Sequence, residues 1–200
     1  MKKTMLDVVG QLFDECYQGV DLDTFESHIC LNVPLNISIA ENIIVVDIET
    51  TGLHPSDGSQ IVTFGYIKGG SLVILQRTKP GIEFDGEIEE VMRQFDDANG
   101  VKIFAFNKMF EFAFLGKYAS CTHITFHEIQ PQFRVSKDKT IKYAHYGYGE
   151  GRQGPYLWAQ YLQTKNTDCL KKIVMHNSQC LLKELAIFMV NDDNHRVRVE

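Results

Sequence analysis

Residues 43–53 read Ile-Ile-Val-Val-Asp-Ile-Glu-Thr-Thr-Gly-Leu, and this stretch decides the fold. Its first four residues are apolar on both alternating faces, which predicts a central strand covered on both sides. Asp47 and Glu49 leave the same face of the strand, while Ile48 points to the other face and into the core. Two carboxylates on a buried face repel each other and lose hydration, which is unfavourable without a cation. The pattern therefore indicates a metal-binding strand end, and an acidic end that dips into solvent is the alternative.

The string resembles the first motif of the DEDD 3′–5′ exonuclease superfamily, whose members have a ribonuclease-H-like fold. The resemblance implies that Asp47 and Glu49 bind two divalent metal ions, Mg²⁺ or Mn²⁺. It also implies that the turn after the strand lies against the terminal nucleotide of the substrate. That turn comprises Thr50, Thr51, Gly52 and Leu53.

Residues 103–115 resemble the second motif of the superfamily, in which a strand leads to Asn and an aromatic–acid pair follows on a helix. Asn107 would cap that helix, Phe110 would face the core or a nucleobase, and Glu111 would stand where the family usually has Asp. Glu is longer by one bond, roughly 1.5 Å, so Glu111 can bind a metal directly or through water. An ordinary solvent-facing Glu is the alternative.

The third motif departs from the family. In one class a C-terminal helix carries Tyr and, four residues later, Asp; here His176 and Cys180 have that spacing. By resemblance His176 would orient or deprotonate the attacking water. Cys180 is a poor ligand for Mg²⁺ and favours a softer metal such as Mn²⁺ or Zn²⁺, or it is a buried core residue. Glu184, one turn further along the same face, is the alternative carboxylate.

A basic segment stands out in an acidic chain. Residues 132–152 carry a local charge of +3, while the whole chain has a formal net charge of −6. Three tyrosines are interleaved with the cations, as in grooves that bind single strands. We expect Lys137, Lys139 and Lys142 to contact a single-stranded DNA or RNA end; a solvated loop is the alternative. The net charge argues against a protein that coats nucleic acid by bulk attraction.

Composition indicates one soluble domain. The 200 residues are 44% hydrophobic and 23% charged, and no apolar run approaches the roughly 18 residues of a membrane helix. Five cysteines without a CxxC pair favour reduced thiols in a cytoplasm. The spacing of Cys121, His123, Cys169, His176 and Cys180 is not typical of a zinc site. A nucleophilic dyad of Cys180 and His176 has no identifiable oxyanion partner.

The periodicity predicts an α/β fold with a mixed sheet, three antiparallel strands first and helices on both faces. A glycine pair, Gly69-Gly70, predicts a tight hairpin between two of those strands. We expect a helix over 4–17, a connector over 18–41, a ribonuclease-H-like domain over 42–190 and a tail over 191–200. Strands are expected at 43–49, 60–67, 71–76, 102–106 and 123–126, and helices at 86–97, 110–115, 156–163 and from 166 or 167 to 190.

The expected function is metal-dependent removal of nucleotides from the 3′ end of a single strand. Asp47, Glu49 and Glu111 would be metal ligands, with His176 activating water. The resemblance is to the predicted-exonuclease branch of the superfamily, because no polymerase domain is attached. In the alternative, the protein keeps this fold without catalysis and binds nucleic-acid ends or a partner protein.

Overall fold

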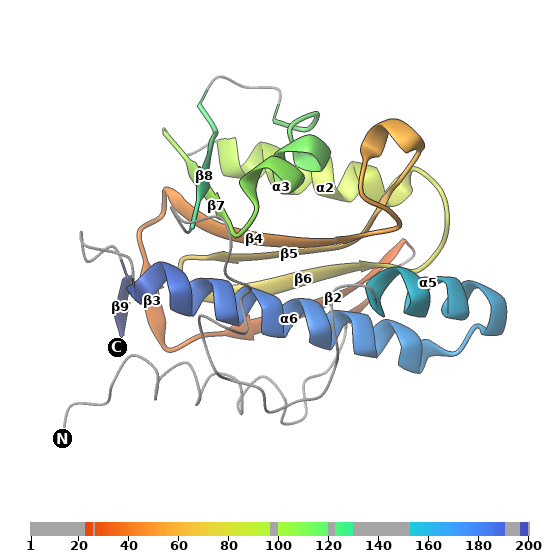
Figure 1. Ribbon diagram of the computed structural model, residues 1–200. Helices are drawn as coiled ribbons and strands as arrows, with labels where there is room; N and C mark the ends of the chain where they lie inside the picture. The colour runs from red at the N-terminus through yellow and green to blue at the C-terminus, as the bar shows by residue number, and fades with distance from the viewer. Residues whose placement is uncertain are drawn as a thin grey trace.

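The computed structural model describes residues 23–25, 27–96, 100–119, 123–129, 153–190 and 197–199. Its core is one sheet with helices against it (Figure 1). The strands are β1 (Asp23–Thr24), β2 (His28–Pro34), β3 (Ile37–Ile39), β4 (Ile43–Thr50), β5 (Ile61–Lys68), β6 (Ser71–Arg77), β7 (Lys102–Ala105), β8 (Thr125–Glu128) and β9 (Val197–Val199). The helices are the 3-10 turn η1 (Pro55–Asp57), α2 (Glu83–Asp96), α3 (Lys108–Leu115), α5 (Gln153–Thr164) and α6 (Thr167–Val190).

The main sheet has seven strands in the order β1-β2-β6-β5-β4-β7-β8. Strands β4, β5 and β6 are consecutive and antiparallel, as the sequence predicts. The two-residue turn Gly69-Gly70 joins β5 to β6, and Gly69 has φ 58°, a conformation that glycine adopts without strain. Strands β7 and β8 then add in parallel to β4, so the sheet is mixed and β4 lies near its centre.

Helices cover both faces of the sheet (Figure 1). Alternate residues of β4 point to opposite faces: Ile44, Val46 and Ile48 pack in one cluster with α2 and α3. Ile43 and Val45 pack in the other cluster with the C-terminal half of α6. Asp47 and Glu49 continue the second series, so these two carboxylates face α6.

The range 18–41, expected as a connector, contains the strands β1, β2 and β3 in its described part. Strand β2 pairs with β6 along its whole length, and β3 pairs with β9 in a separate two-stranded sheet. In β2, Leu31 and Val33 are buried while Asn32 and Pro34 are exposed, which is the period of a half-buried strand. Pro34 obscured the strand in the sequence, but among the described residues its part of β2 pairs with β6 alone, and a proline is tolerated on such an edge.

The remaining predicted elements exist with shifted ends. Helix α2 begins three residues earlier than expected, α5 begins at Gln153 and not near Pro155, and β8 begins at Thr125 and not at 123. The side chain of Asn166 accepts a hydrogen bond from the backbone N–H of Asp168 at 3.0 Å, so Asn166 caps α6 as predicted. The helix expected over 4–17 lies outside the described residues, and the domain division at 42 stays a prediction.

A buried arginine connects the start of α2 to the sheet through hydrogen bonds. Arg77 is fully buried at the end of β6. Its guanidinium donates to the carbonyl of Ile61 at 2.8 Å, to the carbonyl of Gly81, and to Asp85 Oδ1 at 2.9 Å. It also lies over the ring of Phe84, 4.9 Å from the centroid. Because the cation is paired on several sides, its burial is compensated.

Candidate metal centre

The last residues of β4 form one wall of the candidate site. Asp47 and Glu49 are both buried, at 5% and 7% exposure, on the face that α6 covers. The pairing with β5 shifts register between Glu49 and Thr50, so the ladder carries a bulge at this point. Bulges of this kind re-aim side chains and are frequent beside functional sites. The sequence prediction of two buried carboxylates on one strand face is therefore confirmed.

Helix α6 forms the opposite wall and brings His176, Asn177 and Cys180 to the strand end. The close approach depends on Gly65, which pairs with Asp47 across β4 and β5. A Cβ atom at this glycine would lie 2.1 Å from Asn177 Oδ1 and 2.5 Å from a methyl group of Leu181. The strand pair can thus accept the helix only because residue 65 has no side chain.

Asn177 holds Asp47. Its Nδ2 donates to Asp47 Oδ2 at 2.7 Å and reaches the backbone carbonyl of the same residue at 3.3 Å. Asn177 is fully buried, and its Oδ1 has no hydrogen-bond partner in the described structure. Sequence reasoning missed this residue. The available signal was an amide beside His176 in a helix that must pack against the acidic strand.

Glu49, His176 and Cys180 form a compact group of potential metal ligands. Glu49 Oε1 lies 3.3 Å from His176 Nε2, and Cys180 Sγ lies 3.8 Å from the same nitrogen. The three ligand atoms all lie within 4.8 Å of one another, so this buried group can hold a metal ion. His176 and Cys180 are four residues apart, one helical turn, which places both side chains on the same face of α6.

The electrostatics of the metal-free group centre on His176. Burial disfavours the charged ring, but hydrogen bonds to Cys180 and Glu49 outweigh this effect and raise the pKa of His176 to about 11. His176 Nδ1 is buried without a hydrogen-bond partner in the described structure. The ring therefore shares one nitrogen with two acceptors and leaves the other nitrogen unsatisfied.

This geometry does not suit a nucleophilic thiol. In a catalytic triad the nucleophile contacts one imidazole nitrogen, and the acid orients the ring through the other. Here Cys180 and Glu49 both approach Nε2. One N–H carries one hydrogen and cannot point well at both acceptors. Three donors that converge on one point are instead typical of metal ligands.

The first turn of α5 closes the site next to Glu49. Gly154 is buried there, and a Cβ atom at this position would lie 2.6 Å from Glu49 Oε2 and 3.4 Å from Glu49 Cβ. Trp158, one turn further along α5, packs on Val62, Leu170 and Ile173 and holds the helix in place. Sequence reasoning assigned Gly154 no role.

Other predicted site residues are not members of the metal-ligand group. Glu111 is buried in the first turn of α3, so the alternative of a solvent-facing Glu does not apply. Asp47 and Glu111 do not belong to the metal-ligand group found among the described residues. Glu184 is fully buried, and it too lies outside that group. Cys180 is half-buried and contacts His176, which argues against a purely structural core thiol.

The turn after β4 is well defined. The backbone N–H of Thr51 donates to the carbonyl of Gln60 at 2.9 Å, and the N–H of Gln60 donates to Thr51 Oγ1 at 2.9 Å. Leu53 projects into solvent with 72% exposure.

Asn107 occupies the N-cap position of α3 as expected, but its side chain makes no capping hydrogen bond. Phe110 is half-buried and packs toward the core.

Several sequence-predicted residues lie outside the described part of the chain. They are Lys137, Lys139, Lys142 and Cys121. The proposed nucleic-acid contacts of the basic segment therefore stay predictions.

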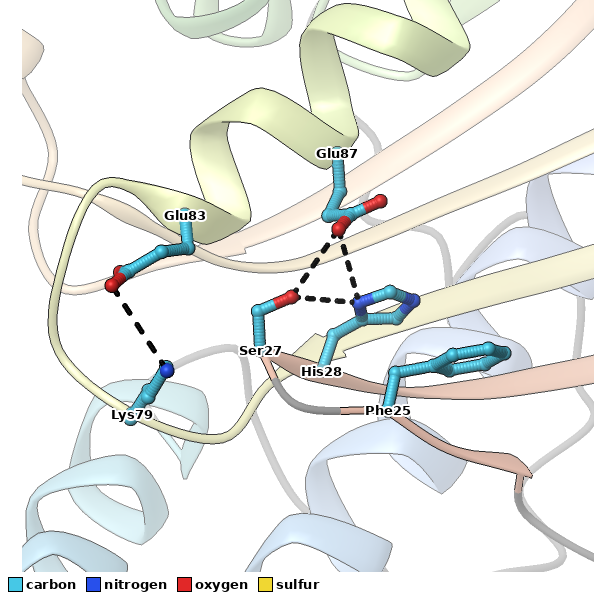
Figure 2. Close-up of a pocket in the computed structure, with 6 residues that line it drawn as sticks. All are labelled: Phe25, Ser27, His28, Lys79, Glu83 and Glu87. Carbon is cyan, nitrogen blue, oxygen red and sulfur yellow. Dashed lines mark hydrogen bonds and ion pairs between the residues drawn. The ribbon is translucent and has the colours of Figure 1, made fainter.

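A separate hollow of about 530 Å³ lies beside α2, away from the metal-ligand group (Figure 2). Figure 2 shows Glu87 of α2 facing Ser27 and His28 at the start of β2, while Glu83 faces Lys79. Ser27 Oγ lies 3.1 Å from His28 Nδ1 and 3.4 Å from Glu87 Oε1. The acid and the hydroxyl both face the same imidazole nitrogen, so the arrangement is not that of a catalytic triad.

Comparisons of the chain with family models, with curated proteins and with solved structures found no match. Within the described ranges, no helix is both long and apolar enough to cross a lipid bilayer. The described residues form an α/β arrangement around a mixed sheet. Because a fold alone does not define a function, function is inferred from the site.

Proposed function

We propose that the protein is a metal-dependent 3′–5′ exonuclease with a ribonuclease-H-like fold that acts on single-stranded nucleic-acid ends. The observation that carries the proposal is the buried pair Asp47 and Glu49 at the end of a central strand, with His176 and Cys180 beside Glu49. Carboxylates next to an imidazole in a covered site are the groups that phosphodiester hydrolysis requires. The order of strands, three antiparallel and then two parallel, supports the same fold.

The donor set accommodates one metal ion better than two. Glu49 supplies a carboxylate oxygen, His176 an imidazole nitrogen and Cys180 a sulfur. A second ion of the expected Mg²⁺ or Mn²⁺ type would need more oxygen ligands. The candidates for that role, Asp47 and Glu111, lie outside the group. We therefore propose one bound ion.

When bound, a divalent ion supplies Lewis-acid activation of water and of the phosphate. The protein's own residues hold and orient the reacting groups. Asn177 fixes the Asp47 carboxylate by donating to Oδ2. Glu49 and Cys180 fix the orientation of the His176 ring through Nε2. The exposed Leu53 and the hydrogen-bonded Thr51 offer an apolar and a polar contact beside the strand end.

A nuclease assay tests this proposal. The full chain is incubated with 5′-labelled single-stranded DNA and RNA and with Mg²⁺, Mn²⁺ or Zn²⁺, and the products are resolved by length. We expect stepwise shortening from the 3′ end, and Glu49→Gln should lower the rate at least about 100-fold. Glu89→Gln, an exposed residue of α2 on the other face, is the matched control and should keep full activity.

Equal rates for the two variants would assign any cleavage to a contaminant and overturn the proposal. Binding of labelled strands without shortening favours the second candidate function, a nucleic-acid-binding protein that does not hydrolyse. One observation favours that candidate: the metal-ligand group contains a single carboxylate. A 3′-phosphate on the substrate separates the two, because it blocks an exonuclease that needs a free 3′ end and leaves simple binding largely unchanged.

A further inference from the structure

We infer that the Glu49–His176–Cys180 group is a single site for a borderline metal ion of the Zn²⁺ or Co²⁺ type, and not a site for Mg²⁺. This inference deepens the proposed function, whose metal site it shares. It departs from the expectation of two hard ions that the resemblance implies. Three features support the inference: the kind of donor atoms, the distances between them and the burial of the residues that carry them.

The donor atoms are one oxygen, one nitrogen and one sulfur. Thiolate and imidazole are preferred ligands of Zn²⁺ and Co²⁺, whereas Mg²⁺ selects oxygen and keeps several waters. Compared with an all-oxygen site, a site in which nitrogen and sulfur supply two of the three protein ligands has a low affinity for a hard ion. The same site has a higher affinity for a borderline ion.

The distances also agree with tetrahedral coordination. Zinc bond lengths in a tetrahedron place nitrogen and oxygen ligands roughly 3.4 Å apart, and nitrogen and sulfur ligands roughly 3.6 Å apart. The corresponding distances are 3.3 Å from His176 to Glu49 and 3.8 Å from His176 to Cys180. Adjacent ligands of an octahedral Mg²⁺ would lie roughly 2.9 Å apart. The spacing of the group fits the larger tetrahedral edges.

The burial pattern leaves the site partly accessible to solvent at Cys180. Glu49 and His176 are buried, and Cys180 is half-buried. Three protein ligands with one position open to solvent are the arrangement of catalytic zinc sites, while structural sites use four protein ligands. Metal binding at Nε2 puts the proton on Nδ1, which is buried and has no hydrogen-bond partner in the described structure.

The test uses metal binding by the metal-stripped full chain, so it does not depend on nuclease activity. We expect native mass spectrometry to show one Zn²⁺ per chain, and calorimetry to give a Zn²⁺ affinity at least about 100-fold higher than that for Mg²⁺. Bound Co²⁺ should show the near-ultraviolet charge-transfer band of a cobalt–thiolate bond and the visible spectrum of tetrahedral coordination.

Two variants and a control assign the ligands. Cys180→Ser should abolish the charge-transfer band and weaken Zn²⁺ binding at least about 100-fold, and Glu49→Gln should weaken binding while keeping the band. Cys30→Ser changes a half-buried cysteine on the other face of the sheet and should leave both readouts unchanged. Circular dichroism confirms that each variant is folded.

Three results would overturn the inference: no bound Zn²⁺, a Co²⁺ spectrum without the thiolate band, or equal affinities for Zn²⁺ and Mg²⁺. The outcome is separable from that of the nuclease assay. Zinc binding without strand cleavage removes the proposed exonuclease and keeps the zinc site. Cleavage in Mg²⁺ by a chain that binds no Zn²⁺ removes the zinc site and keeps the exonuclease.

Discussion

At the scale of single residues, the pair Asp47 and Asn177 shows how a buried charge is made tolerable. The carboxylate is almost fully covered, and the amide of Asn177 donates to it at 2.7 Å from across the helix–strand interface. A hydrogen bond to an ionised group is worth more than one between neutral groups. Asn177 therefore acts as a positioning residue for the acid and ties α6 to β4.

Replacing Asn177 by Leu should destabilise the metal-free protein. The substitution leaves the Asp47 carboxylate without this donor, and we expect a cost of about 1–3 kcal/mol in the free energy of unfolding. In an Asp47→Asn background the same substitution should cost less, since no charge is then left behind. Urea unfolding of the four proteins measures the difference. An equal cost in both backgrounds would show that Asn177 and Asp47 have no interaction energy.

His28 should make stability depend on pH. Burial lowers its pKa below 6.5, and the nearby Glu87 only partly opposes this. The folded state thus disfavours the protonated ring, so the contribution to stability is fully present above pH 6.5 and is lost as pH falls through the lowered pKa. Between pH 7 and pH 5 the free energy of unfolding should fall more steeply for the parent than for His28→Gln. Parallel curves would exclude this role.

Sequence reasoning at this scale succeeded where one element carries the whole pattern. Asp47 and Glu49 were predictable, because the period of a strand places both on one face. Asn177, Gly65 and Gly154 were not, because each acts across an interface between elements that are distant in the chain. Arg77 was missed for the same reason: its partners come from β5, the loop before α2 and α2 itself.

At the scale of elements, the site exists because two helices pack unusually close to β4 and β5. Gly154 of α5 lies against Glu49, and Gly65 of β5 lies under Asn177. At each of these two positions the packing leaves no room for a side chain, so only glycine fits. Glycine substitutions therefore test the geometry of the site more directly than changes in the ligands.

Gly154→Ala should weaken Zn²⁺ binding without unfolding the protein. The added methyl group would displace the Glu49 carboxylate, which is the flexible end of a side chain, so the fold can adapt while the ligand moves. Gly86→Ala in α2 is the matched control, because its Cβ would meet nothing within 4 Å. The control should stabilise the protein by roughly 0.5–1 kcal/mol. Calorimetry and thermal unfolding distinguish the two, and unchanged zinc affinity in Gly154→Ala would contradict the geometry.

Gly65→Ala should destabilise the protein more than Gly154→Ala does. Its methyl group would meet Asn177, Leu181 and Ile74 on three sides, so α6 must move away from the sheet. Overpacking of this kind costs typically about 1–3 kcal/mol and sometimes more. We expect a lower melting temperature together with weaker metal binding. A variant as stable as the parent would show that α6 is held less tightly than described.

Element types were largely predictable from periodicity, and element partners were not. The hairpin of β5 and β6 followed from its glycine pair, and α6 followed from its cap and its length. The pairing of β2 with β6 depends on residues more than 35 positions apart, and nothing local in the sequence indicates it. Long-range strand pairing is decided by the fit of whole faces, which a pass along the chain does not evaluate.

At the scale of the molecule, the formal net charge of −6 opposes the approach of a polyanion. If the protein binds strands, the basic residues of the segment 132–152 must offset this repulsion locally. Changing Lys137, Lys139 and Lys142 to Ala should weaken binding to single-stranded oligonucleotides and flatten its dependence on salt, because fewer counterions are released. Fluorescence anisotropy at several salt concentrations measures both. Equal slopes would assign the segment to ordinary surface.

The small sheet of β3 and β9 has a consequence for the order in which the chain can fold. Its strands pair Ile37 with Val199, so the two partners are separated by almost the whole chain. During synthesis the main sheet can assemble from β2 to β8 before β9, the partner of β3, has been synthesised. Closure of so long a loop is slow and entropically unfavourable on its own. The pairing of β9 is therefore a late folding step, completed after the residues of the candidate metal centre have been synthesised.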